Sequence, residues 1–137
     1  MDVIIGVKAC IVDDGKILLM RRSKDYGDIS GTWDIPGGRT SPGEEPVEGL
    51  RREVKEETGM EISEVLRPLD ARTVFNDGKK QIVRITFLCK AEGEVNISEE
   101  HTDFYWFELK TLDVDMKDNF LKEVLDELKQ NHINGAL

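Results

Sequence analysis

The sequence has 137 residues, of which 39% are hydrophobic, and its formal net charge at neutral pH is −9. This length and composition predict one globular domain over residues 1–137 and exclude a disordered chain. The acidic balance argues against a protein that binds nucleic acid through its phosphate backbone, because such proteins need a basic surface.

Two strands are predicted at the start of the chain, Val3–Val12 and Lys16–Arg22, on either side of the turn Asp13–Gly15. No basic region precedes the first apolar run, and aspartates end it early. We therefore expect neither a signal peptide nor a membrane span. Cys10 and Cys89 lie in apolar runs without a CxxC partner, which indicates buried free thiols in a reducing cytoplasm.

A polar loop, Ser23–Thr32, comes next and leads into the segment Trp33–Gly38. Pro36 and the two glycines after it are expected to end any strand there. A helix is then predicted to begin at Pro46, which suits a first helical position, and to end just before Gly59.

The predicted helix has an apolar stripe that would face a core, at Val47, Leu50 and Val54. Its N-terminal cap is weak, because Glu45 stands where serine or aspartate would cap better. Gly49 leaves room for another group to approach the helix closely.

The second half of the chain continues with strands Glu64–Phe75, Gln81–Ala91 and Asp103–Leu109, followed by an amphipathic helix over Asp118–Asn131. The order of strands, helix, strands and helix predicts an α/β (α+β) fold, in which helices pack on a mixed sheet.

The first predicted helix carries a cluster of like charges at Glu53, Glu56 and Glu57. At about 100° per residue these carboxylates share an arc of roughly 100° beside the apolar stripe. Arg52 lies next to Glu53 and one turn before Glu56, so its guanidinium is placed to orient a carboxylate.

Clustered carboxylates at a core boundary favour a hard divalent cation, which would relieve their repulsion. A solvated acidic helix face is the ordinary alternative, and charge spacing alone does not decide between the two. The wider sequence pattern does favour the metal.

From Gly38 the chain reads glycine, five residues, glutamate, seven residues, and then Arg-Glu-Val-Lys-Glu-Glu-Thr-Gly-Met. This segment resembles the signature of the Nudix (MutT-type) hydrolases at each fixed position, namely Gly38, Glu44, Arg52, Glu53, Val54, Glu56, Glu57, Gly59 and Met60. The chain departs from the common pattern at Gly49-Leu50, where many members have two small alanines.

The resemblance implies an α/β/α sandwich around a mixed sheet and hydrolysis of a diphosphate linkage in a nucleotide. It also implies Mg²⁺ as the cofactor, with Mn²⁺ as a substitute. The implied main metal ligands are Glu53, Glu56 and Glu57. The carbonyl of Gly38 and the carboxylate of Glu44 would support them.

The catalytic residues implied by the resemblance are Glu53, Arg52 and Glu56, with Arg52 orienting a carboxylate. A glutamate must take a proton from the attacking water. Glu53 is the first candidate for this base, and Glu100 is the second, either as the base or as an extra ligand. An exposed loop glutamate is the alternative for Glu100, and His101 is expected to be a loop or packing residue.

Candidate substrate-binding residues are the arginines Arg22, Arg72 and Arg84 for phosphates, and the aromatic residues Trp33 and Phe75 for stacking on a base. Tyr105 is a further stacking candidate. Surface charge is the alternative for the arginines, and core packing is the alternative for the aromatic residues.

The predicted activity is cleavage of a canonical or oxidised nucleoside triphosphate into nucleoside monophosphate and pyrophosphate. A non-catalytic nucleotide-sensing module and a hydrolase of ADP-ribose or nucleotide sugars are the alternatives. The partner would be a small nucleotide, with no nucleic acid and no membrane. A homodimer through the N-terminal strand and the C-terminal segment 133–137 is left open.

Overall fold

The computed structural model describes residues 1–23, 32–133 and 135. Its strands are β1 (Asp2–Asp13), β2 (Lys16–Arg22), β3 (Trp33–Asp34), β4 (Gly37–Arg39), β5 (Glu61–Asn76), β6 (Lys80–Glu92) and β7 (His101–Glu108), and its helices are α1 (Pro46–Thr58), η2 (Leu109–Thr111) and α2 (Asn119–Ile133). Most of the predicted polar loop, residues 24–31, and most of the C-terminal segment lie outside the described residues.

The strands form one mixed sheet in the order β3-β2-β1-β6-β5, with β4 paired to β1 and β7 paired to β2. Strand β1 runs parallel to β6 along ten residue pairs, while the remaining pairings are antiparallel. The parallel pair places the start of β1 beside the start of β6, so residues far apart in sequence lie next to each other in the sheet.

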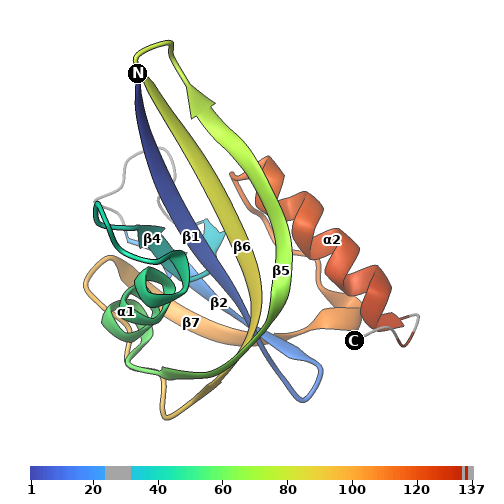
Figure 1. The fold of residues 1–137 in the computed structure, drawn as a ribbon. Coiled ribbons are helices and arrows are strands. Elements are labelled where there is room, and N and C mark those ends of the chain that lie inside the picture. The colour runs from blue at the N-terminus through green and yellow to red at the C-terminus, as the bar shows by residue number, and fades with distance from the viewer. Residues whose placement is uncertain (24–31, 134, 136–137) are drawn as a thin grey trace.

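The helices cover opposite faces of this sheet, as Figure 1 shows for α1 and α2. Alternation along the strands separates two clusters of buried side chains. One cluster packs on α2 and includes Cys10, Ile17, Leu19, Leu88, Leu121 and Leu128. The other packs on α1 and includes Val7, Ile11, Leu18, Leu50, Val54 and Cys89. The predicted α/β/α arrangement is therefore confirmed.

Helix α1 begins and ends where the sequence predicts. Pro46 occupies the first turn, and Glu45 makes no side-chain cap hydrogen bond. Gly59 ends the helix in the left-handed region with φ of 73°, and its N–H donates to the carbonyl of Lys55. Leu50 and Val54 are fully buried, so the apolar stripe faces the core.

One expectation about the strands is wrong. The sequence was expected to end any strand at Pro36 and its glycines, but Gly37–Arg39 forms β4 and pairs with Gly6–Lys8 of β1. Between β3 and β4 the chain changes partner, because β3 pairs with β2 whereas β4 pairs with β1. A Cβ on Gly37 would lie 2.0 Å from the carbonyl oxygen of Val7, so only glycine permits this pairing.

The two cysteines are buried free thiols, as expected. No helix in the described part of the chain has both the length and the apolar character needed to cross a membrane.

Candidate active site

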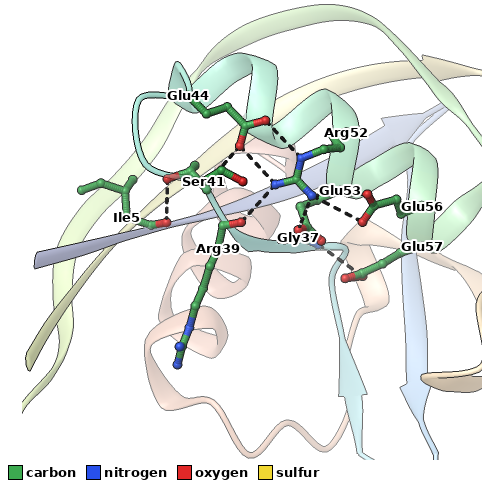
Figure 2. Close-up of polar contacts among 10 residues, drawn as sticks. Ile5, Gly37, Arg39, Ser41, Glu44, Arg52, Glu53, Glu56 and Glu57 are labelled. Carbon is green, nitrogen blue, oxygen red and sulfur yellow. Dashed lines mark hydrogen bonds and ion pairs between the residues drawn. The ribbon is translucent and has the colours of Figure 1, made fainter.

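Arg52 connects the carboxylates of the signature segment (Figure 2). On α1, its Nη1 donates to Glu53 at 2.9 Å and to Glu56 at 3.3 Å. Its Nη2 donates to the backbone carbonyl of Arg39 at 3.2 Å, which ties the helix to β4. The guanidinium therefore fixes the side chains of both glutamates relative to the strand.

Glu44 accepts hydrogen bonds from the Nε and Nη2 atoms of the same guanidinium. Its two oxygens accept from Arg52 Nε at 3.0 Å and from Nη2 at 3.1 Å. The N–H of Ser41 donates to the same carboxylate at 2.9 Å. These hydrogen bonds lower the pKa of Glu44, with the contact from Arg52 as the largest cause. In this structure Glu44 holds Arg52 in place, and both of its oxygens are engaged.

Two glycines make this packing possible. A Cβ on Gly38 would lie 2.5 Å from Glu53 Oε2, and a Cβ on Gly49 would lie 2.8 Å from Thr40 Cγ2 and 2.9 Å from Glu44 Oε1. Real Cβ atoms do not approach so closely. The close approach predicted at Gly49 is therefore made by Thr40 and Glu44.

Glu57 is the buried member of the cluster, with 7% of its surface exposed. The N–H of Gly37 donates to its Oε2 at 3.4 Å. Burial raises the pKa of Glu57 to about 8, with smaller contributions from Glu100 and Glu53, while Lys8 acts in the opposite direction. Burial therefore favours the protonated form of this carboxyl group.

An acidic hollow of about 350 Å³ adjoins these side chains, and we define it by its lining residues Glu53, Glu56, Glu57, Ser98, Glu99 and Glu100. Carboxylate oxygens are the ligands that Mg²⁺ prefers, so the donor set fits a hard divalent cation. Within residues 1–23, 32–133 and 135, no three His, Cys, Asp or Glu side chains already converge for metal binding. Arg52 holds Glu53 and Glu56 instead.

A larger cleft of about 560 Å³ runs beside the hollow, between β4, β1 and β6. Two glutamates, Glu57 and Glu100, are among its lining residues. Four basic residues also line it, namely Lys8, Arg22, Arg39 and Arg84. The cleft thus joins carboxylates that suit a metal ion to cations that suit phosphate groups.

Arg84 is a largely buried cation on this wall. Its side chain donates two hydrogen bonds to Asp118, at 2.6 Å and 3.2 Å, and Asp118 also accepts from the N–H of Leu121 in the first turn of α2. His101 lines the same cleft at the start of β7, with 7% of its surface exposed and no hydrogen-bond partner for Nδ1 among the described residues. His101 was expected to be a loop or packing residue, and the structure places it at the first position of β7.

The remaining predicted substrate residues lie elsewhere. Arg72 is held by Asp70 at 2.8 Å and 3.1 Å and by Glu123 at 3.1 Å, and it does not line the cleft. Phe75 is 44% exposed and contacts Lys80, while its neighbour Val74 lines the cleft. The positions of Arg72 and Phe75 give no support to their predicted roles.

Trp33 lies beside the cleft instead of inside it. It lines a separate hollow of about 250 Å³ together with Arg22, Thr32, Asp34, Lys117 and Asp118. Its ring packs edge-on against Phe107, with 4.9 Å between the ring centroids. Tyr105 also packs against Phe107 and is 59% exposed.

Sequence analysis missed Lys8 and Arg39 as cleft residues. Lys8 had a usable signal, because it is the one charged residue in the otherwise apolar run Val3–Val12. A charge in the middle of a strand is costly unless it has a partner or a function. Arg39 carried no such signal, since it stands in a polar segment.

Comparison with known proteins gives a consistent result. A family model described as "NUDIX domain" matches residues 4–128. A nucleoside triphosphatase, NudI, from Escherichia coli is 39% identical over 106 residues, which cover 70% of this chain and 75% of that protein.

Two solved structures have a similar fold over nearly the whole chain. The MutT NUDIX hydrolase of Burkholderia pseudomallei aligns with a TM-score of 0.79 at 25% identity, covering 93% of this chain and 99% of that one. The MutT protein of Methanosarcina mazei Go1 aligns with a TM-score of 0.78 at 29% identity, covering 96% of each chain.

Proposed function

Since the chain belongs to the Nudix hydrolase family, in which a divalent metal is the general cofactor, we propose that it is a Mg²⁺-dependent nucleoside triphosphate pyrophosphohydrolase. The products would be a nucleoside monophosphate and pyrophosphate. The similarity to NudI, a nucleoside triphosphatase, supports this substrate class over ADP-ribose and nucleotide sugars.

The observation that carries the proposal is the charge arrangement of the cleft. Its lining combines the carboxylates Glu57 and Glu100 with the cations Lys8, Arg22 and Arg84. A triphosphate is a chain of anions, so it would lie along the cations with one linkage beside the carboxylates. A wall with only one sign of charge would bind either the metal or the phosphates.

Glu53, Glu56 and Glu57 would hold the cation, with the Gly38 carbonyl in support. When bound, Mg²⁺ neutralises phosphate charge and lowers the pKa of water. The chain itself supplies orientation, because Arg52 fixes two of these carboxylates. The contacts of Glu44 favour a role in holding Arg52 over a role as a ligand.

A carboxylate must also accept the proton of the attacking water. Glu53 is our first candidate, because its side chain lies against Gly38 at the border between the hollow and the cleft. Glu100 is the second, because it lines both spaces. Replacing each by glutamine separates them, since loss of the base lowers kcat far more than it raises KM.

The first experiment is a substrate panel of canonical and oxidised deoxynucleoside triphosphates, ADP-ribose, NADH, diadenosine polyphosphates and nucleotide sugars, each assayed with Mg²⁺, Mn²⁺ or EDTA. We expect metal-dependent release of pyrophosphate from triphosphates and none with EDTA. Release of inorganic phosphate instead would place the cleavage at a different linkage. Nucleotide binding without turnover across the panel would contradict the proposal and favour a sensing module.

A further inference from the structure

Asp34 is a buried carboxylate that contacts cations from two other strands. It lies on β3 and is 7% exposed. Its Oδ2 accepts from Lys8 Nζ of β1 at 3.1 Å and also from Arg22 Nη2 of β2. Its Oδ1 accepts from the N–H of Ile35 at 2.8 Å. Both oxygens are therefore engaged within the protein.

Each of the two cations is confined by this contact. Lys8 also donates to the carbonyl of Ile35 at 3.1 Å, and its side chain is 13% exposed. The side chain of Arg22 is 23% exposed. Both line the cleft beside Gly37, Gly38 and Glu57, whereas Asp34 lines the neighbouring hollow with Trp33. Asp34 thus acts on the cleft only through its partners.

Lys8 and Arg22 contact the same oxygen of Asp34. Without the negative charge of Asp34, these two cations would repel each other. Burial alone would raise the pKa of Asp34, but Lys8 and Arg22 hold it below its usual value, so the group is ionised. An ionised carboxylate keeps both cations on the cleft wall before any substrate arrives. Preorganised donors lose less freedom when they bind a ligand.

We propose that Asp34 is a positioning residue that holds Lys8 and Arg22 as a two-cation clamp for the phosphate chain of the substrate. This inference rests on the proposed function. It assigns opposite tasks to the two sides of the site. Arg52 is a cation that orients anions around the metal, and Asp34 is an anion that orients cations around the phosphates.

The test is the binding of inorganic tripolyphosphate, measured by calorimetry in EDTA at constant ionic strength. This probe needs neither a metal nor turnover. In Asp34→Asn the side-chain amide presents donors toward one cation, so Lys8 and Arg22 no longer share an acceptor. We expect the variant to bind tripolyphosphate at least 10-fold more weakly than the native protein.

The direction of the effect distinguishes positioning from simple charge. Asp34→Asn removes a negative charge beside an anion site, so a purely electrostatic role would make tripolyphosphate bind more tightly. Tighter or unchanged binding therefore overturns the clamp. Failure of the native protein to bind tripolyphosphate overturns it as well.

Asp70→Asn is the matched control. Asp70 holds Arg72 with two hydrogen bonds on β5, and neither residue lines the cleft. Asp70→Asn therefore also removes an aspartate from an ion pair with arginine, but at a place outside the cleft. We expect tripolyphosphate affinity within twofold of native, and an equal loss in both variants would overturn the assignment.

Kinetics of the active enzyme give a second readout. Asp34→Asn should raise KM for a nucleoside triphosphate about 10-fold and change kcat less than about 3-fold. The effect should vanish when Lys8→Met and Arg22→Gln are also present, because Asp34 then has nothing to position. An effect of full size in that background would overturn the clamp.

The experiments test the clamp and the proposed activity independently of each other. Absence of triphosphate turnover would refute the activity, while the tripolyphosphate titration would still decide the clamp. Circular dichroism and melting temperature establish whether Asp34→Asn is folded. Should it not fold, Asp34→Glu keeps the charge but moves it by one methylene, and native-like tripolyphosphate affinity in that variant overturns the proposal.

Discussion

Arg52 is the residue that holds the carboxylates beside the acidic hollow in position. It contacts Glu44, Glu53, Glu56 and the carbonyl of Arg39. A partly exposed ion pair contributes at most about 1 kcal/mol to stability. The importance of Arg52 therefore lies in orienting carboxylates, and its removal should affect catalysis more than folding.

We predict that Arg52→Gln lowers kcat by about 10- to 100-fold, the usual loss when a residue that orients metal ligands is removed. Its melting temperature should fall by only a few degrees. Steady-state kinetics and calorimetry check both values. Arg51→Gln is the control, since Arg51 donates to the carbonyl of Ile62 and lines neither the hollow nor the cleft. Equal losses of kcat in both variants would contradict the orienting role.

Glu57 should make the stability of the metal-free protein depend on pH. Its pKa is about 8 in the folded state against 4.5 as the ordinary value. Between these values the folded protein binds a proton that the unfolded chain releases. The free energy of unfolding therefore falls as pH rises through this range, by at most about 1.4 kcal/mol per pH unit.

Urea unfolding in EDTA from pH 5 to 8 measures this dependence. Glu57→Gln cannot titrate, so its stability should be flatter over the same range. Glu56→Gln, at an exposed position of the same cluster, should keep the native slope. A native protein that gains stability with rising pH relative to Glu57→Gln would show that Glu57 is ionised in the folded state.

At the scale of elements, helix α1 places the glutamates because both of its ends are set. The first turn uses Pro46, and the last turn closes on Gly59 with φ of 73°. Leu50 and Val54 bury one side against β1, which turns the glutamate arc toward β4. The helix is thus fixed in rotation by its core and in length by its terminal glycine.

We predict that Gly59→Ala destabilises the protein by about 1 kcal/mol, because a left-handed residue with a Cβ is strained. This corresponds to a melting temperature lower by roughly 3–5 °C. Gly78→Ala is the comparison, since Gly78 has φ of +84° but open space around it. Gly59→Ala should cost more, because its Cβ would lie 3.2 Å from Asn96 Cβ. Equal losses of stability in Gly59→Ala and Gly78→Ala would mean that backbone strain alone, without the contact to Asn96, explains the effect.

At the scale of the whole molecule, the sheet brings together groups that are distant in sequence. The cleft takes Lys8 from β1, Arg22 from β2, Gly37 from β4, Arg84 from β6 and His101 from β7. The parallel pairing of β1 with β6 sets Gly6 beside Arg84. Binding of a metal or a nucleotide at this junction should therefore stabilise the fold.

We predict that Mg²⁺ raises the melting temperature relative to EDTA at equal ionic strength. A ligand at 100 times its Kd contributes about 2.7 kcal/mol when it binds only the folded state. In Glu56→Gln and Glu57→Gln the increase should shrink. An increase of the same size in both variants would mean that Mg²⁺ binds outside the acidic hollow.

The local features of this protein were predictable from sequence. Spacing within one helix predicted the helix Pro46–Thr58, the shared arc of Glu53 and Glu57, and the contacts of Arg52 with its neighbouring glutamates. A helical period of 3.6 residues relates such positions without reference to the rest of the chain. The order of strands and helices predicted a mixed sheet with helices packed on it, and the family resemblance implied a helix layer on each face.

The basic side of the cleft depended on tertiary structure. Arg22, Arg72 and Arg84 looked alike as strand arginines, yet Arg22 and Arg84 line the cleft while Arg72 is held by Asp70 and Glu123. Pairing register decides which wall a strand residue faces, and register is a property of two segments instead of one. By itself the sequence determined the helix and its carboxylates. Only the packed sheet decided which cations meet them.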